Sequence, residues 1–322
     1  MKSKRTLFAS LFIGALLLVG CSDDDSAKTL LGNDCIKRSI SPNLVGEYIE
    51  FAYAMALPPS AGKLESVSVS ATIPGAEGTY LDPKSYRTNS SGQDVGVVVV
   101  ANSQLEGNSC KTSFIVDTCA STLRYYYQVP EEAKGKEVSF TFSVKASNGE
   151  QQQYEMGAYK ISKMDMVKDL VFTQRDSAYL SLKTMKIHSL AEITNKPELA
   201  SEIDVVYGFS SKATFGHALY SPTVSSEYLD QAVVPQGATA DSKLVKVWAL
   251  RDQQLSDLQW AIFVDDLDFE QQSFTNSNSY YLGLKAENGV WVESGDKKIR
   301  AYIYINSIAN GRMTVSVKRY LL

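Results

Sequence analysis

Stretches in which apolar and polar residues alternate recur along this chain, and they constrain its fold more than any other feature. In residues 138–146 (VSFTFSVKA), every second position is apolar, as shown by Val138, Phe140, Phe142 and Val144. Successive side chains of a strand point to opposite faces, so this pattern predicts a strand buried on one face. About six to eight such strands fit between residues 34 and 163, with turn signals such as Asn148-Gly149 between them. This spacing predicts an immunoglobulin-like β-sandwich.

Two stretches of this half depart from simple alternation. Val95–Val100 is almost wholly apolar, which predicts a strand buried on both faces. Tyr125-Tyr126-Tyr127 places Tyr126 on the face opposite its two neighbours. One face of that strand is therefore core, and we expect at least one tyrosine hydroxyl at a surface or interface.

A mixed charged segment, Lys160–Asp169, interrupts the alternation and marks a domain boundary. We place the first domain at 34–163 and a second domain at 164–322. The second half has helix-compatible spacing in Ser225–Gln231 and Val247–Trp260, and it returns to alternation towards the C-terminus. The prediction is a mainly β protein, with an immunoglobulin-like sandwich followed by a β-rich sandwich or jelly-roll-like domain carrying one or two short helices.

The N-terminus has the layout of a secretory signal peptide. A charged start is followed by the apolar run Leu7–Leu18, and the small residue Gly20 precedes Cys21. Leu18-Val19-Gly20-Cys21 resembles the lipobox of bacterial lipoproteins, in which the cysteine is lipidated. A transmembrane anchor is one alternative, but the run is shorter than the roughly 20 residues that span a bilayer. A cleaved signal peptide followed by an unmodified cysteine is the other. We expect a signal peptide at 1–20, a lipidated tether at 21–33 and a lipid anchor in the membrane at Cys21.

The acidic run Asp23–Asp25 behind the cysteine looks like the surface-export signal of Bacteroidetes lipoproteins. We therefore expect an outer-membrane protein displayed at the cell surface. The formal net charge of the chain is −4, and loss of the basic signal peptide makes it more negative. This charge argues against nucleic acid as a partner, because phosphate contacts need clustered lysine and arginine. The oligomeric state does not follow from the sequence.

Three cysteines remain after Cys21. A disulfide is plausible in an oxidising compartment. Cys110 and Cys119 are separated by a stretch that reads as extended, too long for a bond between them. Cys35 is therefore the favoured member of a disulfide, with Cys119 slightly ahead of Cys110 as its partner. Three reduced, buried cysteines are an equally good interpretation.

Chemical motifs are scarce. The sequence has no Gly-x-Ser-x-Gly elbow, His-Glu-x-x-His, phosphate loop or Cys-x-x-Cys. We expect no cofactor and no enzymatic activity. The acidic residues Asp265, Asp266 and Asp268 are a weak calcium site, because carboxylate oxygens are the ligands that Ca²⁺ prefers. The simpler interpretation is a solvated loop.

Aromatic residues of the C-terminal strands give a stronger indication of function. Tyr302 and Tyr304 share one face of their strand, and Tyr281 and Trp291 are on neighbouring segments. If the three strands are adjacent, these four rings form one platform suited to the apolar face of a sugar or to a protein partner. The alternative is that this face packs under helices or under the first domain.

Several stretches together resemble a known family. They are the lipobox and the segments Leu123–Pro130, His217–Pro222, Val247–Asp252, Val264–Phe269 and Ala301–Ile305. The chain resembles an uncharacterised family of two-domain surface lipoproteins from gut Bacteroidetes. Such lipoproteins often occur in glycan-capture systems, so the resemblance implies a binding role. It carries over no functional residues.

The expected function is therefore a non-catalytic surface lipoprotein that binds a glycan or a surface protein. Two alternatives remain open: a surface hydrolase that uses the region of Asp265, Asp266 and Asp268, and a structural or adhesive spacer.

Overall fold

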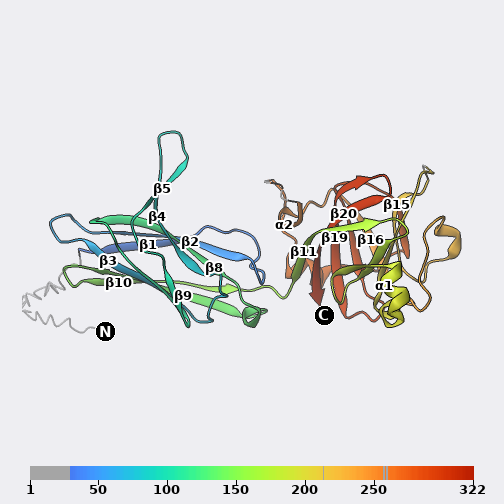
Figure 1. Ribbon diagram of the computed structural model, residues 1–322, viewed down its shortest axis with the longest axis horizontal. Coiled ribbons are helices and arrows are strands. Elements are labelled where there is room, and N and C mark those ends of the chain that lie inside the picture. Colours follow the sequence, from blue (N-terminus) through green and yellow to red (C-terminus); the bar gives the residue numbers. More distant parts are fainter. Residues whose placement is uncertain (1–29, 213, 257, 259) are drawn as a thin grey trace, which may run out of the picture.

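The chain folds into two β domains that lie end to end (Figure 1). The computed structural model describes residues 30–322 except 213, 257 and 259. Each domain consists of two five-stranded antiparallel sheets. The boundary that we predict after residue 163 lies in the short connection between the last strand of the first domain and the first strand of the second.

The first domain is a sandwich of two sheets, here called sheet 1 and sheet 2. Sheet 1 has the order β1 (Gly32–Lys37), β2 (Tyr48–Ala56), β8 (Ala120–Gln128), β4 (Tyr80–Thr88) and β5 (Asp94–Val98). Sheet 2 has the order β10 (Gln151–Lys160), β9 (Glu137–Ala146), β3 (Leu64–Ala71), β7 (Ser109–Ser113) and β6 (Gln104–Glu106).

The alternating patterns place an aromatic core between these sheets. Phe140 and Phe142 of β9 are buried, and Phe51 of β2 meets them with ring centroids 4.8 and 5.3 Å away. Tyr125 and Tyr127 of β8 are also buried in this core. The Tyr127 hydroxyl donates to the Ile73 carbonyl at 3.0 Å, which satisfies its polar end.

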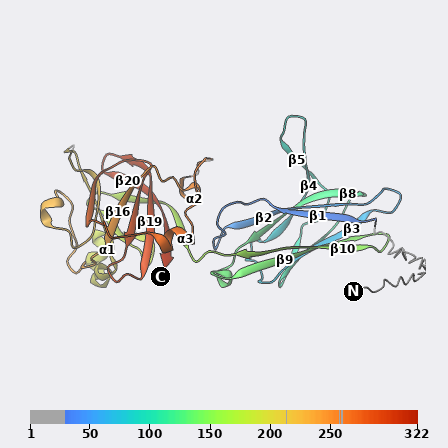
Figure 2. The same cartoon turned by 180° about the vertical axis from the view of Figure 1, so that it is seen from behind.

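The prediction of a doubly buried strand at Val95–Val100 is wrong for most of its length. Val99 and Val100 are buried, but Val95, Val97 and Val98 are 36, 55 and 48% exposed. These three residues belong to β5, the outermost strand of sheet 1. The hairpin of β4 and β5 projects away from the sandwich, so no second layer covers it (Figures 1 and 2).

The second domain also has two facing sheets. Sheet 3 has the order β11 (Asp165–Thr173), β20 (Arg312–Leu321), β19 (Ile299–Ala309), β18 (Asn288–Glu293) and β16 (Lys243–Trp248). Sheet 4 has the order β13 (Lys186–Ser189), β12 (Ser177–Ser181), β14 (Val205–Ser210), β15 (Gly216–Tyr220) and β17 (Tyr280–Leu284). Aliphatic side chains of both sheets form the core between them.

Helices in this domain are few and short. α1 (Leu190–Asn195) begins at a capping box, in which Ser189 and Glu192 each bond the other's backbone N–H. Among the described residues of 247–260, which were predicted to be helical, one helical turn is present, α2 (Gln253–Ser256). α3 (Asp266–Gln271) follows it. Within the described residues, no helix has the length and apolar character needed to cross a bilayer.

The described residues between 249 and 274, which include α2 and α3, contact the outer face of sheet 3. We call them the cover segment. Phe269 of α3 packs edge-on against Trp291 and parallel to Tyr320, with ring centroids 5.0 and 5.7 Å away. Sheet 3 is therefore buried on both faces in this region.

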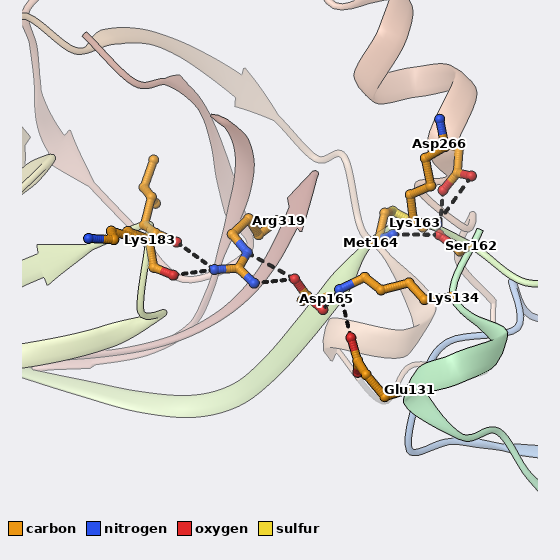
Figure 3. Close-up of polar contacts among 10 residues, drawn as sticks. Glu131, Lys134, Ser162, Lys163, Met164, Asp165, Lys183, Asp266 and Arg319 are labelled. Carbon is orange, nitrogen blue, oxygen red and sulfur yellow. Dashed lines mark hydrogen bonds and ion pairs between the residues drawn. The ribbon is translucent and has the colours of Figure 1, made fainter. Parts of the chain in front are cut away.

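The cover segment also joins the two domains. Leu44 of the first domain and Met164 of the connection are buried in the same apolar cluster as Phe269. Asp266 of α3 accepts hydrogen bonds from the Ser162 hydroxyl and the Lys163 N–H (Figure 3). Its carboxylate also lies 3.2 Å from the Lys160 ammonium. A partly buried carboxylate with three donors holds the connection in place.

A second polar contact crosses the junction on the other side. Asp165 of β11 pairs with Lys134 of the first domain and with Arg319 of β20 (Figure 3). Arg319 also donates to the carbonyls of Leu182 and Lys183. Burial alone raises the pKa of Asp165, but hydrogen bonds from Lys134 and Arg319 outweigh it and hold that pKa below its usual value.

Candidate functional site

The predicted aromatic platform on sheet 3 is not an open surface. Trp291, Tyr302 and Tyr304 do share one face, but each is at most 3% exposed. The cover segment lies on them, and the Tyr302 hydroxyl donates to the Leu250 carbonyl. The prediction of a solvent-exposed aromatic platform is therefore wrong for these three residues. They pack under helical turns instead, which is the alternative given above.

Tyr281 lies elsewhere. It belongs to β17 of sheet 4, where it pairs with Leu219 of β15. The chain passes from sheet 4 to sheet 3 between β17 and β18, so the two strands are not neighbours in one sheet. Tyr281 therefore does not join Trp291 on a common face.

The acidic residues Asp265, Asp266 and Asp268 have structural partners. Asp265 is the N-cap of α3 and accepts from the backbone of Leu267 and Asp268, and Asp268 accepts from the Asp265 N–H at 2.9 Å. Asp266 points to the domain junction instead. The described residues contain no group of three or more side chains placed to hold a metal.

The cysteines are unpaired in the described part of the chain. Cys35 and Cys110 are buried, and Cys119 is partly buried. Cys35 is opposite Tyr53 of β2 in the sheet. The Cys119 carbonyl accepts a hydrogen bond from the N–H of Leu57, which is four positions further along the chain than Tyr53 and directly follows β2. Four residues of strand span about 13 Å, beyond the reach of a disulfide. The predicted Cys35–Cys119 bond is absent for this reason.

Sequence reasoning missed a buried ion pair beneath the cover segment. Lys318 of β20 lies 2.6 Å from Asp252, and both side chains are 0% exposed. Asp252 also accepts from the N–H groups of Leu255 and Val264, and Lys318 donates to the Val264 carbonyl. Burial lowers the pKa of Lys318, although Asp252 opposes this shift. Alternation alone assigns Lys318 to an outward, solvated face.

An exposed tyrosine cluster does exist, on the outer face of sheet 1. Tyr80 of β4 stacks on Tyr126 of β8 with ring centroids 4.9 Å apart and planes 14° apart. Tyr48 of β2 meets Tyr126 edge-on at 6.0 Å. Tyr48 and Tyr80 are both 40% exposed. We call these three residues the tyrosine face.

The tyrosine face follows from strand alternation and register. Tyr125 and Tyr127 point into the core, so Tyr126 points out, as predicted. Tyr80 is directly opposite Tyr126 in the β4–β8 ladder. Tyr48 is at the start of β2, two positions from Glu50, which is paired with Tyr126. Strand alternation predicted the outward position of Tyr126. The sequence did not show which strands lie beside β8, so Tyr48 and Tyr80 were missed.

Charged groups border this face. The Arg124 guanidinium lies over the Tyr86 ring, 3.8 Å from its centroid, and pairs with Asp94. The Tyr86 hydroxyl donates to Asp82 at 2.8 Å. Partial burial and this bond to Asp82 raise the pKa of Tyr86 to about 12. Burial, followed by the nearby Tyr126 hydroxyl and Asp82, raises the pKa of Tyr80 as well. The hydroxyls of Tyr80 and Tyr86 are therefore protonated at neutral pH.

A concave surface lies on the outer face of sheet 2. It encloses about 460 Å³ and is lined mainly by hydroxyl, amide and ammonium groups, including Ser68, Ser143, Lys111 and Lys145. Lys111 pairs with Glu106, and Lys145 pairs with Glu65. No aromatic ring lines this hollow, so it lacks the flat apolar surface that the tyrosine face provides.

Together these features define a class: a two-domain β-sandwich protein with polar and apolar contacts at its domain junction and a cluster of tyrosines on the outer face of its first domain. The chain belongs to the DUF4466 family. The model described as "Domain of unknown function (DUF4466)" matches residues 28–161. The model described as "Domain of unknown function (DUF8576)" matches residues 162–322.

A solved relative supports this assignment. The crystal structure of a DUF4466 family protein from Parabacteroides merdae is 51% identical, with a TM-score of 0.88, and the match covers 91% of this chain and 99% of that chain. The resemblance to an uncharacterised two-domain family of gut Bacteroidetes is thereby confirmed. The major pilin subunit of Bacillus cereus aligns at 10% identity with a TM-score of 0.27, which carries no argument. No curated protein sequence matches the chain.

Proposed function

We propose that this protein is a lipid-anchored, non-catalytic surface protein that binds a glycan at the tyrosine face of its first domain. The observation that carries the proposal is the exposed ring of Tyr80 stacked on the partly buried ring of Tyr126, with the exposed ring of Tyr48 edge-on beside it. Large exposed rings gathered on one sheet face indicate a recognition surface.

The chemistry of the face suits a sugar. The C–H groups of a pyranose pack against flat rings, and its hydroxyls need donors and acceptors at the edge of those rings. The tyrosine hydroxyls would donate to sugar oxygens. The carboxylates of Glu50 and Asp82 lie near Tyr80 and would accept from sugar hydroxyls, beside the donors Arg38 and Tyr86 that they already bond. Arg124 is already held by Tyr86 and Asp94, so it offers a pre-ordered donor at low entropic cost.

The membrane anchor is the second part of the proposal. Cys21 and the acidic run behind it lie outside the described residues, so this part depends on the lipobox-like sequence. Multiple acyl chains on one cysteine anchor a protein stably. The same sequence supports an outer-membrane location with display at the cell surface.

Titration calorimetry of the tagged mature chain against neutral plant, host and microbial oligosaccharides tests the binding site. Tyr126→Ala removes the central ring and is expected to weaken binding by up to about tenfold, given about 0.5–1.5 kcal/mol for a stacked ring. The matched control is Tyr228→Ala, which disrupts the stacked pair Tyr228 and Tyr280 on the second domain.

Unchanged affinity in Tyr126→Ala would exclude the tyrosine face as the binding site. Equal loss in Tyr228→Ala would do the same, because the effect would then not be specific to this surface.

A further inference from the structure

The edge strand β5 is unusual for a natural sheet. It pairs only with β4, from Thr88 opposite Asp94 to Lys84 opposite Val98, and it is last in the order of sheet 1. The β4–β5 hairpin stands clear of the sandwich in both views (Figures 1 and 2). Among the described residues, β4 alone pairs with β5, so the backbone groups on the outer edge of β5 are open to another strand.

The side chains of β5 do not protect this edge. Natural edge strands carry lysine, proline, bulges or inward charges that discourage pairing with other chains. β5 has the sequence Asp-Val-Gly-Val-Val, and its one charge, Asp94, is already paired with Arg124. Val97 and Val98 are half exposed on opposite faces of the strand. The edge is apolar on both sides and open along its backbone.

More aliphatic surface continues from the end of β5. The Val99 carbonyl accepts a hydrogen bond from the Ile115 N–H at 2.9 Å, so Ile115 lies beside the strand end. Ile115 and Val116 are 60 and 42% exposed. An added strand would cover these side chains together with the valines.

We propose that β5 accepts an extended segment of a partner protein as a sixth strand of sheet 1. Backbone bonds along an edge give affinity in such strand addition, and alternate side chains give specificity. The segment that fits carries alternating β-branched apolar residues, because these pair well with exposed valines.

The length of the edge argues for a peptide segment over a second copy of this chain. Five residues span about 17 Å. A stable contact between two folded proteins buries about 800 Å² on each partner, which is more than a projecting strand of this length offers. An extended segment needs no such area from neighbouring loops, because its own side chains wrap both faces of the hairpin.

Fluorescence anisotropy with a labelled peptide tests the proposal. The probe is acetyl-Lys-Thr-Val-Thr-Val-Thr-Lys-amide, and its control is the same peptide N-methylated at both valines, which blocks backbone donors on one edge. We expect the first peptide to bind the mature chain and to slow amide exchange in residues 94–98, and the methylated peptide to bind about tenfold more weakly or not at all.

Two variants complete the test. Val97→Lys places a charge on the edge and is expected to weaken peptide binding about tenfold. Val233→Lys, at a valine that is 50% exposed in the second domain, should leave it unchanged. Equal binding of both peptides, no binding, or no effect of Val97→Lys would overturn the proposal. Concentration-dependent dimerisation that Val97→Lys abolishes would assign the edge to a second copy instead.

Discussion

Lys318 and Asp252 form an ion pair with no solvent access, 2.6 Å apart, between sheet 3 and the segment that covers it. Two backbone N–H groups also donate to the carboxylate of Asp252. Each of these buried charges is stabilised by the other, because neither side chain can reach water unless the cover segment detaches from sheet 3.

We therefore expect Lys318→Met to lower the free energy of unfolding by about 3–5 kcal/mol, because it leaves the Asp252 charge buried without its counter-ion. Urea unfolding of the mature chain measures this. The control is Lys298→Met, which breaks a 3.9 Å pair with Asp296 between side chains that are 79 and 56% exposed. That change should cost under about 1 kcal/mol. Similar losses in the two variants would contradict the prediction.

The domain junction should loosen in acid. The pKa of Asp165 is lowered in the folded protein, so its contribution is present above the unfolded value of about 3.9 and is lost as the pH falls through the lower, folded value. We expect protease cleavage in residues 161–164 to increase at acidic pH, measured with an acid-active protease such as pepsin.

Asp165→Asn provides the comparison at neutral pH. It weakens the contacts with Lys134 and Arg319 without acid, so small-angle scattering at pH 7 should show a more extended or more variable pair of domains than in the wild type. Identical scattering from the two proteins would mean that these ion pairs do not hold the junction.

Asp204 should give the opposite pH dependence. It is 9% exposed, and burial, with Asp296 and Glu202 nearby, raises its pKa to about 6. Between pH 4 and 6 the unfolded chain loses a proton that the folded protein keeps, so stability falls as the pH rises through this window. Asp204→Asn should raise the free energy of unfolding at pH 7 by on the order of 2 kcal/mol and leave it unchanged at pH 3.

Asp241→Asn is the matched control for that measurement, because a hydrogen bond from Lys243 lowers the pKa of Asp241. This variant should be slightly less stable than the wild type at pH 7. A stabilising effect of the same size at both positions would show that burial of Asp204 is not the cause.

Lipidation predicts a simple labelling result. Cys21→Ser should abolish incorporation of an alkyne fatty acid in the native host and move the protein to the soluble fraction. Cys119→Ser, at a partly buried cysteine of the folded domain, should keep both label and membrane association. Replacement of Asp23–Asp25 by asparagine should keep the label but protect the protein from protease added to intact cells.

Strands that bury one face against the opposite sheet were predictable. β9 and β8 follow the alternation of their sequences, including the outward position of Tyr126. In these cases the residues of the strand themselves record which face is in the core, so local information is sufficient.

The errors share a different cause. Trp291 and Tyr302 lie on the outward face, as alternation requires, but whether that face meets water depends on a segment tens of residues away in sequence. Val97 is apolar and exposed because its hairpin extends past the opposing sheet. Tyr281 was assigned to the wrong sheet because the turn after its strand leads to the facing sheet, and the sequence of a turn does not show whether the next strand joins the same sheet or the facing one. Each outcome depends on long-range arrangement, which a pattern within one strand does not contain.

The cover segment couples the stability of the second domain to that of the domain junction. It seals Lys318 and the aromatic side chains of sheet 3, and the same few turns bind the first domain through Asp266. Detachment of this segment would release the domain contact and hydrate the buried pair in one event. The second domain and the junction should therefore melt as a single cooperative unit, with the tyrosine face held on a sandwich that unfolds independently of it.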